Sequence, residues 1–277
     1  MTDSQIIETP LKVLETLGSP EYACDWTRGI PEWMNGIGPE HIPALIDLVL
    51  QWPAKYLEDP NEPSTWAPVH AWRALGFLKA VEAVGPLLSL YNQLDKIGDD
   101  WYLEDSVDMF GLIGPEAIEP LNEYFKDKSN SLYPRAATLE ALLSIAKHHP
   151  ETRDRIVELQ VQALSGYEEE DEELNGFIIC NLLDLKAVES VELIKKAFEA
   201  GRVNRGVVSE NSIRDELHVN ISPPGGVKSG KNISGGIDDD GDIWTQRSSQ
   251  TGKSKSSRNK KAKRKQQEKS RKKNRKK

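Results

Sequence analysis

The sequence predicts an all-α protein, a right-handed α-solenoid of about five helical hairpins followed by a disordered linker and a basic tail. Three observations lead to this fold class. Apolar residues recur at helical spacing in paired segments, most clearly between Trp101 and Ala146. A Gly-Pro hinge separates the members of a pair, and the helix before it recurs after 35, 32 and 40 residues. One pair cannot bury its apolar stripes alone, so successive pairs must stack.

The segment from Trp101 to Ala146 shows the pattern of one unit. The apolar residues that share a face are Leu103, Val107 and Phe110 in the first predicted helix and Ile118, Leu121 and Phe125 in the second. Gly114 stops the first helix and Pro115 starts the next, with Glu116 in the first turn, where the helix dipole favours an anion. The same hinge occurs at Ile37–Leu45, and a weaker copy occurs at Ala83–Leu88.

Four segments follow from these patterns. Residues 1–20 are predicted to form a lead-in helix, and residues 21–217 form the solenoid. Residues 218–252 are rich in Gly, Ser and Asn without an apolar period, which predicts a flexible linker because too little apolar surface is available to offset chain entropy. Residues 253–277 form a disordered Lys/Arg-rich tail.

Three sequence segments carry a resemblance to a known family. They are Pro39–Leu45, Ala67–Gly76 and Ala197–Val203. Together with the repeated hinges, they resemble HEAT repeats of the short variety also found in phycobilisome lyase-like proteins, and more narrowly a group of poorly characterised bacterial HEAT-type proteins. The resemblance covers roughly residues 20–217 and implies an α-solenoid fold.

The net charge of −8 hides a division between an acidic body and a basic tail. Residues 253–277 hold 15 Lys or Arg and one acid, Glu268, so the tail carries +14 and residues 1–252 carry −22. The tail has no apolar stripe, which argues against membrane insertion. The basic residues expected to contact a polyanion are Lys260, Lys261, Lys263, Arg264, Lys265, Arg271, Lys272, Lys273, Arg275, Lys276 and Lys277.

The tail is consistent with three roles. It can bind RNA, the ribosome or an acidic protein, with affinity that comes from phosphate-type contacts and does not discriminate between sequences. It can also fold back on the acidic body, or only increase solubility.

The expected location is the cytoplasm. The segment Met1–Glu8 has neither a basic start nor an apolar core, and no apolar run approaches the roughly 18 residues of a membrane span. The two cysteines, Cys24 and Cys180, are too few for a disulfide framework or a zinc cluster and are expected to be thiols in a reducing compartment.

Two segments match known binding motifs at some positions but lack residues that the motifs require. Gly225–Lys231 spells GxxxxGK, but Asn232 stands where Ser or Thr would meet magnesium. Asp238–Asp242 has the composition of a calcium loop, but Gly236 and Arg247 would occupy the first and twelfth positions. No HExxH, CxxC or GxSxG pattern occurs, so we predict no catalytic residue, no metal and no cofactor.

The predicted groove of the solenoid has five candidate binding residues: Trp72, Trp101, Glu104, Asp105 and Asp108. Glu104 and Asp108 share a helix face, which suits a basic peptide, although acids in a first helical turn also have a structural role, with Asp100 as the predicted cap. We therefore expect a non-enzymatic adaptor that binds a protein partner in the groove and a polyanion with its tail. The alternative is a phycobilin lyase-like enzyme or chaperone that holds a bilin or phycobiliprotein in the groove, with Trp72 and Trp101 in the pocket.

Overall fold

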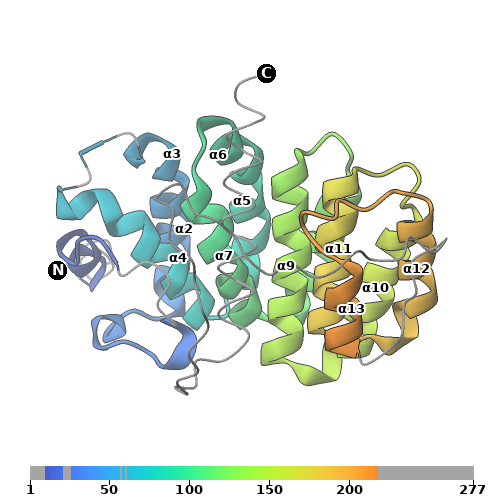
Figure 1. Ribbon diagram of the computed structural model, residues 1–277. Coiled ribbons are helices and arrows are strands. Elements are labelled where there is room, and N and C mark those ends of the chain that lie inside the picture. Colours follow the sequence, from blue (N-terminus) through green and yellow to red (C-terminus); the bar gives the residue numbers. More distant parts are fainter. Residues whose placement is uncertain (1–9, 21–25, 57, 60, 218–277) are drawn as a thin grey trace, which may run out of the picture.

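The computed structural model describes residues 10–20, 26–56, 58–59 and 61–217 (Figure 1). These residues form helices and no strand, which confirms the prediction of an all-α chain. Within them, no helix combines the length and the apolar character needed to cross a membrane. The predicted linker and basic tail, residues 218–277, lie outside the described part of the chain.

The main helices form two rows. The first row consists of α4 (Ala67–Phe77), α7 (Asp100–Ile113), α9 (Leu132–His148), α11 (Glu172–Asp184) and α13 (Glu210–Leu217), and each member packs against the next. The second row consists of α2 (Ile42–Leu50), α5 (Val84–Ser89), α8 (Ile118–Lys126), α10 (Arg153–Ser165) and α12 (Val191–Glu199), in which α2 packs on α5, α5 on α8, and α10 on α12. Two shorter helices, α3 (Trp52–Lys55) and α6 (Tyr91–Ile97), extend α2 and α5.

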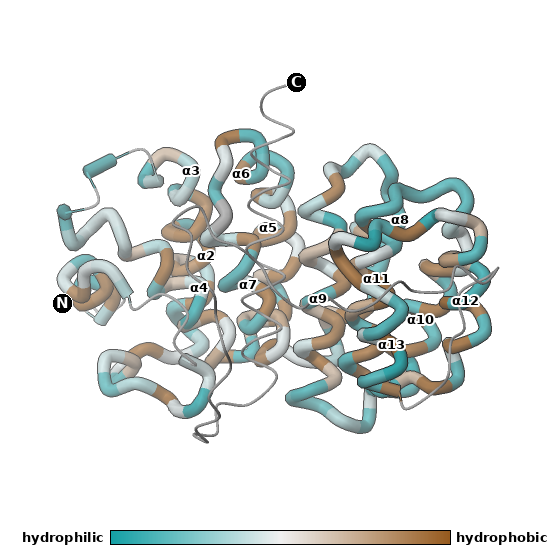
Figure 2. Tube along the Cα trace, in the orientation of Figure 1, coloured by the Kyte–Doolittle hydropathy of each residue, from teal (hydrophilic) through white to brown (hydrophobic). Residues whose placement is uncertain are grey.

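The core lies between the rows and between neighbours within a row. α9 illustrates this arrangement, because it contacts α7 and α11 in its own row and α8 and α10 in the other. Every residue of α9 from Tyr133 to Ala146 is buried except Glu140. In Figure 2 most helices alternate between hydrophobic and hydrophilic segments, and the loops at the top of the view beside α9 and α11 are hydrophilic. This is the pattern of amphipathic helices that bury one face.

Five short 3₁₀ turns lead directly into the second-row helices, and we call them hinge turns. They are η4 (Pro39–His41), η6 (Val81–Ala83), η7 (Pro115–Ala117), η8 (Pro150–Thr152) and η9 (Val188–Ser190). The middle residue of each is an exposed glutamate: Glu40, Glu82, Glu116, Glu151 and Glu189. A carboxylate in this place is favoured because the next helix presents its positive dipole end there.

Two of the hinge turns stand where the Gly-Pro pattern predicts them, whereas the weaker copy at Ala83–Leu88 does not mark one. Gly85 lies inside α5, and the hinge turn is Val81–Ala83. The reason is a Schellman motif at the end of α4. Lys79 adopts a left-handed conformation with φ 53°, and the backbone N–H of Ala80 donates to the carbonyl oxygen of Leu75 at 3.0 Å.

In the N-terminal segment, where a lead-in helix is predicted, the described residues 10–16 are helical, with α-helix at Pro10 and Leu11 and 3₁₀ helix in η1 (Lys12–Thr16). η1 packs on α4 and on η5 (Pro63–Trp66). Leu14 is fully buried and anchors η1 to the core. Two further 3₁₀ turns, η2 (Trp26–Arg28) and η3 (Glu32–Met34), follow before the first hinge turn.

We predict that Lys79→Gly stabilises the protein by about 0.5–1 kcal/mol, because glycine adopts the left-handed conformation without the steric cost that a side chain meets. The free energy of unfolding in urea measures the effect. Lys195→Gly, in the middle of α12, is the matched control and should cost about 1 kcal/mol. A loss of stability at both positions would contradict the role given to Lys79.

Candidate interaction surface

The start of α7 is fixed by a buried carboxylate. Asp99, and not the predicted Asp100, is the N-cap, and its Oδ1 accepts hydrogen bonds from the backbone N–H groups of Trp101 at 2.8 Å and Tyr102 at 3.3 Å. The indole N–H of Trp52 donates to Asp99 Oδ2. Asp99 is fully buried, so these bonds satisfy the charge where water cannot reach it. They set the direction in which the four predicted site residues of α7 project.

These four residues, Trp101, Glu104, Asp105 and Asp108, occupy one side of α7 because they are spaced by three, four and seven residues from the first. All four are partly buried. We call them the α7 stripe. The structure therefore brings together the four candidates that lie on this helix, and they differ in what they contact.

Asp105 faces α4, and both of its carboxylate oxygens accept hydrogen bonds there. Its Oδ2 accepts from the Trp72 indole N–H at 2.6 Å and from Arg73 Nε at 2.9 Å, while its Oδ1 accepts from Arg73 Nη2 at 2.8 Å. Trp72 has no exposed surface, and the side chains of Arg73 and Asp105 are only 7% and 13% exposed. Trp72 and Asp105 were predicted to bind a partner in a groove. The structure places Trp72 in the interior, and the two residues join α4 to α7.

Asp108 faces α9 on the other side of the stripe. Its Oδ1 accepts a hydrogen bond from Ser144 Oγ at 3.3 Å. One turn further along α7, a Cβ at Gly111 would overlap Ser144 Oγ and lie 3.0 Å from His148 Cδ2. Glycine at this position allows α7 and α9 to approach closely.

The stripe also has an outward part. Trp101 packs against Trp66 with ring centroids 5.3 Å apart, and both rings are partly exposed. Glu140 lies one turn before Ser144 on the same side of α9. We call Glu104, Asp108 and Glu140 the acidic seam. With Trp101 beside it, the seam offers carboxylates and an aromatic surface, which suits a basic segment of another molecule.

A second buried ion pair lies further along the first row. Arg135 donates to both carboxylate oxygens of Glu170, at 3.0 and 2.6 Å, and to the carbonyl oxygen of Phe125 at 2.7 Å. The hydrogen bonds from Arg135 hold the pKa of Glu170 below its usual value of 4.5. This pair ties α9 to the loop before α11.

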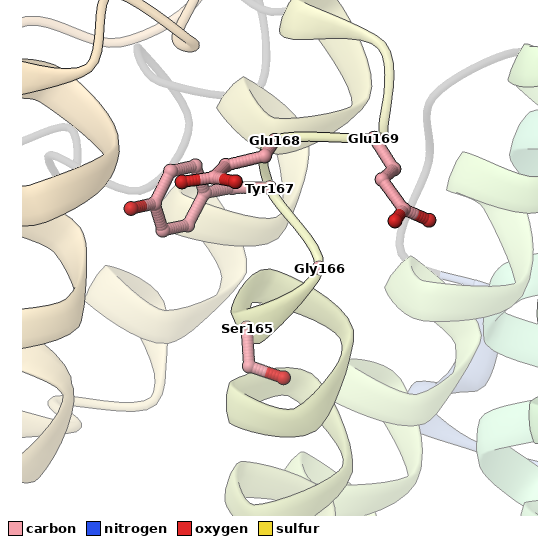
Figure 3. Close-up of a pocket in the computed structure, with 5 residues that line it drawn as sticks. All are labelled: Ser165, Gly166, Tyr167, Glu168 and Glu169. Carbon is pink, nitrogen blue, oxygen red and sulfur yellow. The ribbon is translucent and has the colours of Figure 1, made fainter.

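A surface hollow lies beside this loop, lined by Ser165, Gly166, Tyr167, Glu168 and Glu169. Figure 3 shows Tyr167 and Glu168 pointing to one side of the loop and Glu169 to the other. The side chains therefore do not converge on one point as those of a catalytic site do. Within the described part of the chain, no group of three or more His, Cys, Asp or Glu residues is arranged to hold a metal ion.

The hinge turns carry a feature that the sequence analysis missed. The pentapeptide Leu-Lys-Ala-Val-Glu occurs twice, at Leu78–Glu82 and Leu185–Glu189, and both copies have the lysine at positive φ. Val81 and Val188 are 42% and 58% exposed, in the place that proline occupies in the other three hinge turns. The identical pentapeptide is the sequence signal of this second kind of hinge turn, which has no Gly-Pro pair.

The described residues thus define an all-helical protein in which one unit recurs: a first-row helix, a hinge turn and a second-row helix. The chain belongs to the family described as "Protein of unknown function (DUF1186)", whose model matches residues 80–224, just over half of the chain. No curated protein and no solved structure matches the chain. The family match begins at the end of α4, so α2, α4 and the residues before them lie outside it.

We predict that Asp105→Asn lowers the free energy of unfolding by about 3–5 kcal/mol, because it leaves the Arg73 charge buried without its partner. Urea denaturation measures the loss. Glu123→Gln is the matched control, since it removes a carboxylate from an exposed ion pair with Lys126 and should change stability by less than about 1 kcal/mol. Equal effects of the two substitutions would show that Asp105 does not hold α4 on α7.

We also predict that Gly111→Ala costs about 1–3 kcal/mol, because the added methyl group overpacks the contact between α7 and α9. Ser144→Ala in the same chain should recover part of the loss, since it removes the hydroxyl that the methyl group would overlap. A double-mutant cycle in urea measures the coupling. Strictly additive losses of stability for the two substitutions would show that the cost of Gly111→Ala does not come from its contact with Ser144.

Proposed function

We propose that the protein is a non-enzymatic scaffold: a right-handed α-solenoid of HEAT-like hairpins that binds a protein partner on its first-row face and a polyanion, RNA above all, with its basic tail. The observation that carries this proposal is the division of charge, with +14 on residues 253–277 and −22 on the rest of the chain. The two parts attract ligands of opposite charge, so one chain can bridge them.

The solenoid part of the proposal is supported by the way the units repeat. Each first-row helix packs on the next, and five hinge turns with the same central glutamate lead into the second row. Units of this kind present a row of outward faces, which is how repeat proteins form extended binding surfaces. The acidic seam and Trp101 provide the chemistry for a partner segment that carries Lys or Arg.

The described residues favour a scaffold over the bilin-holding alternative. A bilin pocket built on Trp72 needs that indole to be accessible, and Trp72 is fully buried with its N–H donated to Asp105. The carboxylate of Asp105 is likewise engaged by Arg73. An assay of coloured adduct formation with bilin and apoprotein remains the direct test of the alternative.

The tail is expected to bind RNA through phosphate contacts, so affinity should fall steeply with salt. For single strands the slope of log K against log salt is about −0.7 per phosphate neutralised, so six contacts weaken binding about 300-fold between 50 and 200 mM salt. Fluorescence anisotropy of full-length protein with a labelled single-stranded RNA measures this slope.

Two tail variants make the RNA measurement decisive. Replacement of the eleven basic residues from Lys260 to Lys277 named above by Gln should abolish binding at 50 mM salt. A variant with the same tail residues in scrambled order is the control and should bind like the wild type, because phosphate contacts do not depend on tail sequence. Binding that survives the Gln replacement would contradict the role of the tail.

A further inference from the structure

The outward side of the first row, which we call the first-row face, is covered by another part of the chain where it is formed by α4. α7 leaves its stripe partly exposed, whereas every residue of α4 from Ala67 to Gly76 is buried. The cover is the N-terminal strap, which we define as residues 10–20 and 26–36. In Figure 1 the dark-blue η1 of the strap lies beside α4, and the two are in contact. The strap lies outside the family match, so it is an addition to the part of the chain that defines the family.

The strap is attached to α4 by ring contacts and one hydrogen bond. Trp26 packs edge-on against Phe77 at 5.5 Å, and the Arg73 guanidinium stacks over the Trp26 ring at 5.1 Å. His70 contacts Trp33 with ring centroids 5.6 Å apart, and its Nε2 lies 2.8 Å from the carbonyl oxygen of Gly18. Of these contacts, only those of His70 involve a group that titrates near neutral pH.

The geometry indicates which ring nitrogen of His70 carries the proton when the strap is closed. Because a carbonyl oxygen only accepts, Nε2 carries the proton and donates a hydrogen bond to the carbonyl oxygen of Gly18. Nδ1 is then the bare nitrogen, and it is buried without a hydrogen-bond partner in a residue that is 5% exposed. A second proton on Nδ1 would have no acceptor, and a buried N–H without an acceptor is unfavourable.

The charged groups around His70 do not reverse this preference. Burial is the largest influence and lowers the pKa of His70 below 6.5; the Gly18 hydrogen bond raises it, Arg73 lowers it and Asp105 raises it. Arg73 is on α4 itself and Asp105 is on α7, where both of its oxygens are already bonded to Arg73 and Trp72. The strap faces His70 with a carbonyl group and an indole, neither of which carries a negative charge.

We infer that the N-terminal strap is a pH-responsive cover: it closes over α4 when His70 is neutral, and protonation of His70 opens it and exposes the first-row side of α4. The inference is independent of the proposed function, because it concerns only the contact between strap and α4. An open strap would extend the accessible first-row face from the α7 stripe to the neighbouring helix.

The direction of the pH dependence follows from linkage. The closed strap binds fewer protons than the open one. Its stability relative to the open state is therefore greatest above the open-state pKa of His70, about 6.5, and decreases as the pH falls toward the lower pKa of the closed state. A single proton changes the ratio of open to closed strap by at most about tenfold per pH unit.

Hydrogen exchange of the full chain measures strap opening directly. At pH 7.5, 6.5 and 5.5 we expect the protection of peptides from the strap, corrected for intrinsic exchange rates, to fall by up to about tenfold per unit below pH 6.5, while peptides from α12 keep theirs. His70→Gln should abolish this change, because Gln keeps an N–H donor for Gly18 and does not titrate. His148→Gln, at an exposed histidine, is the matched control and should behave like the wild type.

Equal pH dependence in the wild type and in His70→Gln would overturn the inference, as would constant protection of the wild-type strap. If His70→Gln opens the strap already at pH 7.5, the NMR titration of His70 in the wild type decides instead. A pKa below 6.5 that rises when the strap is removed up to residue 36 supports the linkage. A pKa of 6.5 or above in the intact chain refutes it.

Discussion

The fold depends on one constraint, that the chain reverses between rows within a single hinge turn. A helix can be followed this closely by another only if its last carbonyl groups are satisfied locally, and the Schellman motifs after α4 and α11 do this with Lys79 and Lys186 at positive φ. Because the reversal is short, the first-row helices run in one direction and their hinge turns meet the second row in the same way. The outward residues of α7 and α9 consequently come to lie on one side, which makes a shared surface possible.

Polar contacts then fix how one unit sits on the next. Arg73 and Asp105 are 32 residues apart, Arg135 and Glu170 are 35 apart, and Ser144 and Asp108 are 36 apart, which is one unit in each case. Apolar packing tolerates small shifts of one helix along another, whereas a bidentate Arg–carboxylate pair does not, because its two hydrogen bonds require one geometry. Since breaking such a pair leaves a buried charge, the Arg73–Asp105 pair holds α4 on α7, and the Arg135–Glu170 pair holds α9 on the loop before α11. These contacts thus join residues of consecutive units in the described part of the chain.

The sequence was most informative where a property is local. The hinges at Gly38-Pro39 and Gly114-Pro115 could be predicted, because the residues that end one helix and begin the next are adjacent in the sequence. The hinge at Val81–Ala83 could not be found by the same rule, since a lysine in the left-handed conformation has no glycine signature. Spacing placed Glu104 and Asp108 on one face of α7, but it could not predict that Asp105 forms a buried ion pair. That pair depends on Trp72 and Arg73, which lie a whole unit away, and the cover of α4 depends on Gly18, which is 52 residues from His70.

The arrangement of charge has a consequence for any ligand of the tail. The strongest ion pairs of the body are internal, whereas the five hinge glutamates and many other acids are exposed. Under the proposed function, a tail of +14 joined to such a body would meet it at an effective concentration in the millimolar range, so an RNA ligand would have to compete with the acidic surface of the same chain. Each phosphate contact releases condensed counterions, so a dense phosphate array gains more from contact with the tail than scattered carboxylates do, although added salt reduces this gain. Under the proposed function, the acidic body would therefore act against weak, non-specific binding and leave the tail available mainly to polyanions of high charge density.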